Sequence, residues 1–274
     1  MLSILNEFLN RTTMYKVLAY GLLLLVLQGI ILTIFKFLPF DLVWISLSLI
    51  VITLSCYVSN GLIARLFNIP TNIESALITG LILFLIIQPA SRPSDLLAIF
   101  LIALLAMAAK YIFMWNRLHI FNPAAIAALL GGFLFNYYAT WWVGNTLMLP
   151  LVFIVGVLIV KKIRRFTMIG IFLLTASIII LISDFSFLKI LTAWPIIFFA
   201  TVMLTEPLTM PGTKKIQLLY ATFIGIIFGL RFNLGWIIST PELALVLGNI
   251  LFFVIKPRSK FVLVLKEKIQ LAPD

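Results

Sequence analysis

The sequence predicts an all-α polytopic membrane protein with about ten transmembrane segments, arranged as two inverted five-helix repeats with broken helices. The 274 residues are 63% hydrophobic and 11% charged, with a mean hydropathy of +1.20. Soluble chains are about half apolar and about a quarter charged. The apolar runs are too continuous for the alternating strands of a membrane barrel. In addition, two proline motifs recur at one fixed offset, which indicates a repeated unit.

Ten apolar segments follow one another along the chain, at roughly 14–35, 42–60, 74–88, 96–113, 122–138, 145–160, 167–183, 188–204, 216–231 and 238–255. The first run follows Arg11 and Lys16, as in a signal peptide. We expect a span instead, because the run is long enough to cross a bilayer and no small-residue cleavage site follows Phe35. The run at 74–88 is short, about 22 Å as a helix, so protein must cover its ends.

The basic residues predict the orientation of the spans. With the N-terminus in the cytoplasm, the outer loops hold only Lys36, Arg92, Lys189 and Arg231 of the 20 Lys and Arg residues. This bias follows the positive-inside rule, so we expect a multi-pass protein of the inner (plasma) membrane with both termini cytoplasmic. The basic, amphipathic tail at 257–274 is expected to rest on the inner surface. Orientation also explains the net charge of +11 better than nucleic-acid binding does.

Proline motifs mark the breaks. Gln88–Pro93 and Glu206–Pro211 both read polar-Pro-x-hydroxyl-x-Pro, 118 positions apart, and both close an apolar run. The same offset pairs Asn122-Pro123 with Thr240-Pro241, which open runs. Pro89 and Pro207 end helices, whereas Pro123 and Pro241 suit the first helical position.

Because each repeat has an odd number of spans, the second enters the membrane upside down. The sequence therefore predicts a first repeat at 1–138, an inverted second repeat at 139–256, and sites near the bilayer midplane between broken helices.

Glu206 is the acidic residue of a break motif and has two interpretations. It is a carboxylate at a broken helix that binds a cation, a proton or a cofactor hydroxyl, or it is a surface charge near Lys214 and Lys215. Asn122 and Thr240 head half-helices whose free N–H groups suit an anion or an electron-rich ring, or they are plain N-caps.

For the other polar and aromatic residues we expect the positions that are common in membrane proteins. Arg117 and His119 are placed to meet a flavin or quinone, but we favour an interfacial belt, as we do for Tyr137-Tyr138 and Trp141-Trp142. Lys110 is expected to snorkel from a span end, and Asp95 to be an outer-loop charge. Cys56, the lone cysteine, supports neither a disulfide nor a metal cluster. The sequence has no phosphate-binding loop, dinucleotide fingerprint or nucleophile elbow.

The run Phe121-Asn122-Pro123-Ala124 resembles the F-N-P-A motif of the NqrB/RnfD family, which contains membrane subunits of the sodium-pumping NADH:quinone reductase and of the Rnf electron-transport complex. Thr205–Pro211 is similar to its T-D-P-[VA]-[TS]-x-P motif, with Glu206 in place of Asp, and Glu74–Pro89 is similar to its third span. The similarity covers roughly residues 40–255.

The resemblance implies a ten-span, urea-transporter-like fold and flavin-mediated electron transfer in a complex with other subunits or a flavin-carrying protein. It implies a redox-complex subunit rather than a complete enzyme, in which FMN or riboflavin is bound and electron transfer is coupled to Na⁺ or H⁺. The candidate cofactor-binding residues are Arg117, Asn122, Thr205, Glu206, Thr209 and Thr240. Family members attach FMN to a threonine in an S-G-A-T motif, which the region 138–146 lacks, so we expect noncovalent flavin. The alternatives are a small-solute channel or transporter and a scaffold without cofactor.

Overall fold

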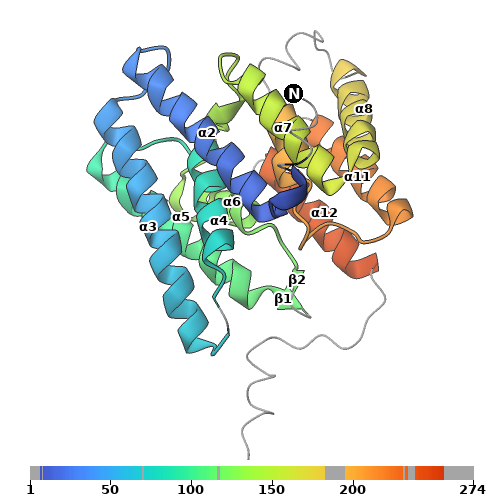
Figure 1. Cartoon of the computed structure of the whole chain (residues 1–274), viewed down its shortest axis with the longest axis horizontal. Helices are drawn as coiled ribbons and strands as arrows, with labels where there is room; N and C mark the ends of the chain where they lie inside the picture. The colour runs from blue at the N-terminus through green and yellow to red at the C-terminus, as the bar shows by residue number, and fades with distance from the viewer. Residues whose placement is uncertain are drawn as a thin grey trace, which may run out of the picture.

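The chain folds into an assembly of apolar helices (Figure 1). This computed structural model describes residues 7, 9–69, 71–115, 118–182, 195–230, 232–233 and 238–255. The α-helices are α2 (Met14–Ile34), α3 (Leu42–Leu66), α4 (Ile73–Ile86), α5 (Pro93–Ile112), α6 (Pro123–Phe135), α7 (Leu149–Ile163), α8 (Phe166–Ile182), α10 (Ile196–Phe198), α11 (Lys214–Gly229) and α12 (Pro241–Ile255). A 3-10 turn, η1 (Trp142–Gly144), and a π-helical segment, η2 (Phe199–Met203), complete the helical elements of the described residues.

Each of the ten predicted apolar segments contains helix in its described part. Three of these helices, α2, α3 and α5, are long and apolar enough to cross a membrane. The apolar helices α4, α6, α8 and α12 are shorter. Proline begins α6 and α12, and a proline motif follows α4. The described part of the chain is therefore helical and of membrane type, with three helices long enough to cross a bilayer.

A small hairpin interrupts the helical pattern between α5 and α6. Strands β1 (Met114–Trp115) and β2 (Leu118–His119) pair antiparallel, in a stretch that the sequence led us to expect as an interfacial loop. The hairpin places β2 directly before the half-helix α6.

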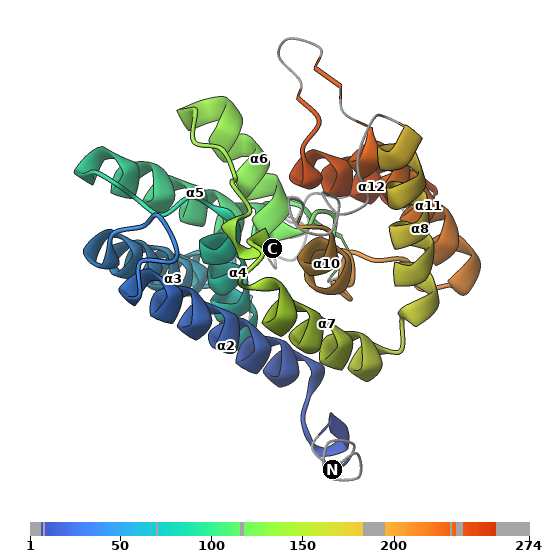
Figure 2. The same cartoon turned by 90° about the horizontal axis from the view of Figure 1, so that it is seen from above.

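The helices form two groups (Figure 2). Helices α2, α3 and α5 lie beside α4 on one side, whereas α8 and α11 lie together on the other. Close contacts join the groups. A Cβ atom on Gly21 of α2 would lie 2.5 Å from Val155 of α7, and one on Gly156 of α7 would lie 2.7 Å from the Thr201 hydroxyl of η2. Small residues of this kind let membrane helices approach closely.

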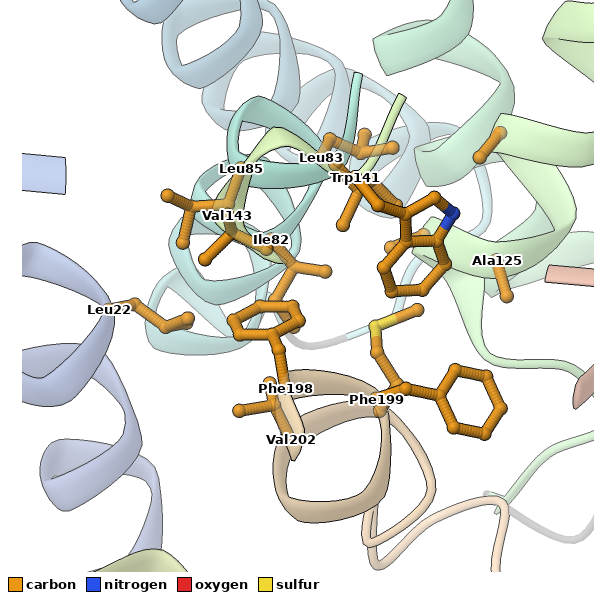
Figure 3. Close-up of a cluster of buried hydrophobic side chains, with 14 of the residues drawn as sticks. Leu22, Ile82, Leu83, Leu85, Ala125, Trp141, Val143, Phe198, Phe199 and Val202 are labelled. Atoms are coloured by element: carbon orange, nitrogen blue, oxygen red, sulfur yellow. The ribbon is translucent and has the colours of Figure 1, made fainter. Parts of the chain in front are cut away.

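The apolar core lies where α4 meets α10 and η2 (Figure 3). Leu83 and Leu85 of α4 are fully buried, as are Phe198 and Phe199 from the other group. The Trp141 ring packs over Phe198 and Phe199, with centroid distances of 6.4 and 5.9 Å. The two short, broken helices are thus the most deeply buried elements, which explains how segments too short to span are shielded from lipid.

Candidate functional site

The two half-helices α6 and α12 begin as the sequence predicts. Pro123 and Pro241 occupy their first positions. Asn122 Oδ1 accepts a hydrogen bond of 3.0 Å from the Ala125 amide, and Thr240 Oγ1 accepts one of 3.3 Å from the Leu243 amide. Both residues therefore act as N-caps, which satisfies amides that the helix itself leaves free.

Asn122 also takes part in a polar chain between the two groups of helices. Its backbone amide donates to Asn249 Oδ1 of α12 at 3.0 Å, and Asn249 Nδ2 donates to the Tyr220 hydroxyl of α11 at 2.8 Å. All three residues are at most 2% exposed. Because buried polar groups are costly unless paired, this chain fixes α6 against α11 and α12.

The second break follows the π-helical segment η2. Thr205 Oγ1 donates to the Thr201 carbonyl at 2.7 Å, and Thr209 Oγ1 donates to Glu206 Oε2 at 3.2 Å. Both threonines are buried, whereas Glu206 is half-buried. Segments of π-helix are frequent at functional sites. Here the segment leads directly into the acidic residue that the motif singled out.

Lys110 is the basic residue that acts electrostatically on Glu206. It is 5% exposed, and its Nζ donates to Ser75 Oγ at 2.7 Å. The expectation that it snorkels to the surface is therefore wrong, because α4 lies beside the end of α5 and supplies the hydroxyl that binds it. The interpretation of Glu206 as a surface charge near Lys214 and Lys215 stays a prediction, since its side chain is half-buried.

Further ionisable groups surround these two. Tyr15 of α2 and Tyr220 of α11 both interact with the Glu206 charge, and Cys56 of α3 interacts with Lys110. We call Lys110, Glu206, Ser75, Thr209 and Tyr220 the Glu206 cluster. In a chain with so few charged residues, this gathering of polar side chains makes the Glu206 cluster the candidate functional site. No group of His, Cys, Asp and Glu side chains in the described residues is arranged to hold a metal ion.

His119 lies in β2, beside this cluster. Burial and the Lys110 ammonium lower the pKa of His119 to about 4, so the imidazole is neutral at physiological pH. Its Nδ1 atom is buried and has no hydrogen-bond partner among the residues that the structure describes. The interfacial-belt interpretation thus misses its burial. Arg117, the other basic candidate of this stretch, lies outside the described residues.

The first break, Gln88–Pro93, is stabilised by different contacts. Asp95 is 8% exposed, and its carboxylate accepts hydrogen bonds from the Ser91 amide and hydroxyl, each at 3.0 Å, and from Arg92 Nε at 2.9 Å. The expectation of a loop charge is wrong, because the side chain folds back over the start of α5. Tyr137 closes the break from the other side by donating its hydroxyl to the Gln88 carbonyl at 2.9 Å.

Two adjoining cavities lie near this break and the start of α12. The Thr240 cavity has a volume of about 420 Å³ and is lined by Ala128, Leu129, Gly132, Phe133, Asn136, Tyr138, Ile238, Thr240 and Glu242. The Arg92 cavity has a volume of about 380 Å³ and is lined by Gln88, Ser91, Arg92, Asp95, Asn136, Tyr137, Tyr138 and Thr140. They share Asn136 and Tyr138, so together they connect the first break with the start of the second half-helix.

Glu242 is a site residue that the sequence reasoning missed. It is 3% exposed and accepts a hydrogen bond of 2.9 Å from Trp141 Nε1. Trp142 Nε1 similarly donates to the Phe84 carbonyl at 2.7 Å. The aromatic-belt expectation is therefore wrong for both tryptophans, whose ring N–H groups find partners in the core. An acidic residue directly after Thr240-Pro241 was the signal that could have found it.

The candidate residues fall into two places, because the polar chain of Asn122 ends at Tyr220 of the Glu206 cluster, whereas Thr240 lines a cavity. Asn122 belongs to the polar chain, Thr205, Glu206 and Thr209 belong to the second break, and Thr240 lines a separate cavity. No model of a known protein family matches the chain, and a comparison with curated proteins found no match. The site's chemistry therefore has to be argued from its residues.

Proposed function

We propose that the chain is a multi-pass membrane protein built from two inverted five-helix repeats, at 1–138 and 139–256. The equivalent half-helices α6 and α12 begin 118 positions apart and contact each other, as do the first helices of the two repeats, α2 and α7. Contacts between α3 and α5 also correspond to those between α8 and α11. An experimental structure checks this: a two-fold axis along the membrane normal, rather than in its plane, would contradict the inverted arrangement.

We also propose that the protein lies in the inner (plasma) membrane, with both termini in the cytoplasm. The supporting observation is the distribution of Lys and Arg between the predicted loops. Reporter fusions at the C-terminus test it, since a reporter that is active only in the periplasm contradicts this orientation.

We infer that the protein is the membrane subunit of a flavin-dependent electron-transport complex of the Rnf or NADH:quinone reductase type. One observation carries this inference. The Thr205–Pro211 motif lies at a helix break whose acidic side chain interacts electrostatically with a buried lysine from the other repeat. The resembling family uses this motif in redox subunits, and the arrangement links the two halves at a charged, protein-enclosed position.

The residues permit a noncovalent flavin in the Thr240 cavity. Its volume of about 420 Å³ is within the range of about 300–1,000 Å³ that holds small ligands. Tyr138 offers a 54% exposed aromatic ring there, and Asn136 and Thr240 offer polar atoms. The hydroxyls of Thr205, Thr209 and Thr240 and the backbone amide of Asn122 already have hydrogen-bond partners within the chain.

The flavin, when bound, supplies the electron-transfer chemistry. The part of this chain is to hold the ring against Tyr138, to keep water from it with the apolar side chains of Phe133 and Leu129, and to present polar atoms at Asn136 and Thr240. Other subunits, or a flavin-carrying partner, supply and remove the electrons, and membrane lipid surrounds the helices.

The absorption spectrum of the purified protein tests this proposal. We expect flavin bands that bleach on reduction, and retention of flavin should fall about two- to tenfold in Tyr138→Ala, because ring stacking contributes about 0.5–1.5 kcal/mol. Tyr20→Ala is the matched control, since Tyr20 is similarly exposed, at 51%, on α2. A protein that carries no flavin with its partners present would contradict the electron-transport function.

The flavin should not be covalent. Thr140 and Thr146 are the threonines between the repeats, and neither lies in an S-G-A-T motif. After co-expression with a flavin transferase and denaturation, we expect a gel band without flavin fluorescence. Fluorescence that disappears in Thr140→Ala or Thr146→Ala would show covalent attachment.

A second candidate function is a small-solute channel or transporter. The two adjoining cavities favour it, because they lie near a broken helix and share a polar lining at Asn136 and Tyr138, as transporter sites commonly do. Solute uptake by the purified protein in liposomes, together with an absence of flavin, would support this function over electron transport.

A further inference from the structure

The end of α3 and the start of α4 border a groove of about 380 Å³ that has no part in the proposed function. Val58, Leu62 and Ile73 form its apolar wall and are 46%, 55% and 48% exposed. Arg65, in the last turn of α3, is the charged side chain among the lining residues. An apolar wall that ends at one guanidinium group suits an amphiphile with an anionic head.

The polar end of the groove offers hydrogen-bond donors. Asn60 is 1% exposed, and its Oδ1 accepts a hydrogen bond of 2.8 Å from the Tyr111 hydroxyl. No described residue accepts from Asn60 Nδ2, so this group is free to bind an occupant. Thr71, on the opposite side, adds an exposed hydroxyl. Donors without competing acceptors favour an occupant that is rich in acceptor oxygens, such as a phosphate.

The beginning of α4 strengthens this preference. Asn72 caps the helix by accepting a hydrogen bond from the Ser75 amide at 3.0 Å, and the positive end of the helix dipole lies at Ile73, in the groove wall. Glu74 belongs to the same turn, but it does not line the groove. The guanidinium and the helix start therefore act in the same direction on a bound anion.

We propose that this groove binds the phosphate headgroup of an anionic phospholipid, whose acyl chains lie along Val58, Leu62 and Ile73. The guanidinium of Arg65 matches a phosphate in geometry and charge, and basic pockets at helix ends are typical lipid headgroup sites. The proposal does not depend on electron transfer. It predicts a specific lipid bound to the protein in addition to the surrounding bilayer.

Two variants and two matched controls isolate the groove. Arg65→Gln removes its charge, and Lys16→Gln removes a charge elsewhere, near the start of α2. Gly61→Leu fills the groove from within, because a Cβ atom on Gly61 meets nothing within 4 Å. Gly170→Leu is its control, since Gly170 in α8 is equally unobstructed. None of these changes requires the helices to move.

Native mass spectrometry of the full chain, released from vesicles of phosphatidylglycerol or phosphatidylcholine, measures the retained lipid. We expect one phosphatidylglycerol to be retained over phosphatidylcholine. Arg65→Gln should weaken this retention at least about tenfold, because a neutral amide cannot replace the charge-assisted hydrogen bonds of the guanidinium group. Gly61→Leu should weaken it by a similar factor, whereas both controls should change it less than about twofold.

Several results would contradict this lipid site. Equal retention of the two lipids would overturn the proposal, and so would wild-type retention in both Arg65→Gln and Gly61→Leu. An equal loss in Lys16→Gln would show a diffuse attraction of basic residues to anionic lipid rather than a site. Melting curves of all four variants, expected to match the wild type, separate a loss of the groove from a loss of fold.

Discussion

The two helix breaks carry the same motif, yet they neutralise their acidic side chains differently. At the first break Asp95 is bound by its immediate neighbours, Ser91 and Arg92. At the second break Glu206 has a local hydroxyl, from Thr209, but the cation that acts on it is Lys110 of α5, which belongs to the other half of the chain. One break is therefore electrostatically self-contained, whereas the other depends on how the two halves are packed.

Within the proposed repeat, this difference favours different roles for the two breaks. A charge that is fully bound by its own loop holds that loop in place and contributes to stability. A charge that is compensated from another helix changes its energy whenever the two helices move relative to each other. The second break is thus the better candidate for function, and the first break for stability.

The largest expected effect separates the two acidic residues by stability. Asp95→Asn should lower the free energy of unfolding by about 2 kcal/mol, because it weakens charge-assisted hydrogen bonds to a buried group. Glu206→Gln should change it by less than about 1 kcal/mol, since a half-buried charge is replaced by a neutral amide. Denaturation in detergent, followed by circular dichroism, measures both. Equal losses of unfolding free energy in the two variants would contradict the proposed difference between the two breaks.

The two breaks can also be compared through a side chain of a neighbouring helix that forms a hydrogen bond with each of them. Ser48 Oγ accepts a hydrogen bond of 2.8 Å from the Ala90 amide, and Gln217 Nε2 donates one of 2.8 Å to the Pro211 carbonyl. Ser48→Ala and Gln217→Ala should each lower the unfolding free energy by about 1–2 kcal/mol, because a buried backbone group loses its partner. The same denaturation assay measures both losses.

Ser59→Ala is the control for this pair. Its hydroxyl bonds the Ser55 carbonyl within α3, as the Ser48 hydroxyl bonds the Trp44 carbonyl, but it makes no contact with a break. We expect a loss below about 0.5 kcal/mol. If Ser48→Ala is no more harmful than this control, the first break does not depend on α3.

The sequence predicted the breaks and the helix starts well, because these features depend on local chemistry. Proline removes an amide and restricts the preceding residue, so the ends of α4 and the starts of α6 and α12 could be located from Pro89, Pro123 and Pro241. The capping roles of Asn122 and Thr240 follow from the same few positions. The repeat stays a prediction that depends on the constant offset of 118 positions between the motifs.

The burial of Lys110, Asp95 and the two tryptophans was not predicted, because their surroundings depend on folding. Lys110 of α5 donates a hydrogen bond to Ser75 of α4, and Trp141 donates one to Glu242, which lies 101 positions later in the sequence. For Asp95 the partners are close in sequence, but only the tight turn at the break brings Ser91 and Arg92 around its carboxylate. Residue type alone predicts that Lys, Asp and Trp lie at the membrane interface. Hydrogen-bond partners that only the folded chain brings close allow these side chains to be buried instead.

The proposed function gives the next comparison. In the complete complex, Glu206→Gln should slow electron transfer at least about tenfold, which corresponds to about 1.4 kcal/mol of lost stabilisation, because the charge facing Lys110 disappears. Asp95→Asn should stay within about twofold at equal amounts of folded protein. The measurement is the rate of flavin reduction by the physiological donor. Equal slowing in the two variants would return Glu206 to a structural role.

The smallest expected effect is the coupling between Lys110 and Glu206 themselves. The structure gives them no direct ion pair within 4 Å, but each acts on the other's charge. In a partly buried environment two such charges interact by about 1 kcal/mol. A double-mutant cycle of Lys110→Met and Glu206→Gln, measured by unfolding free energy, should therefore show a coupling of about that size.

The first break supplies the reference for this last measurement. A cycle of Lys110→Met with Asp95→Asn should show a coupling below about 0.3 kcal/mol, because the two residues lie in the last and first turns of α5, about 22 Å apart along the helix. If both cycles give the same coupling, Lys110 acts on acidic groups generally, and the dependence of the second break on the other half disappears. If only the cycle with Glu206 is coupled, that interaction provides a route by which relative movement of the two halves alters the charge at the second break.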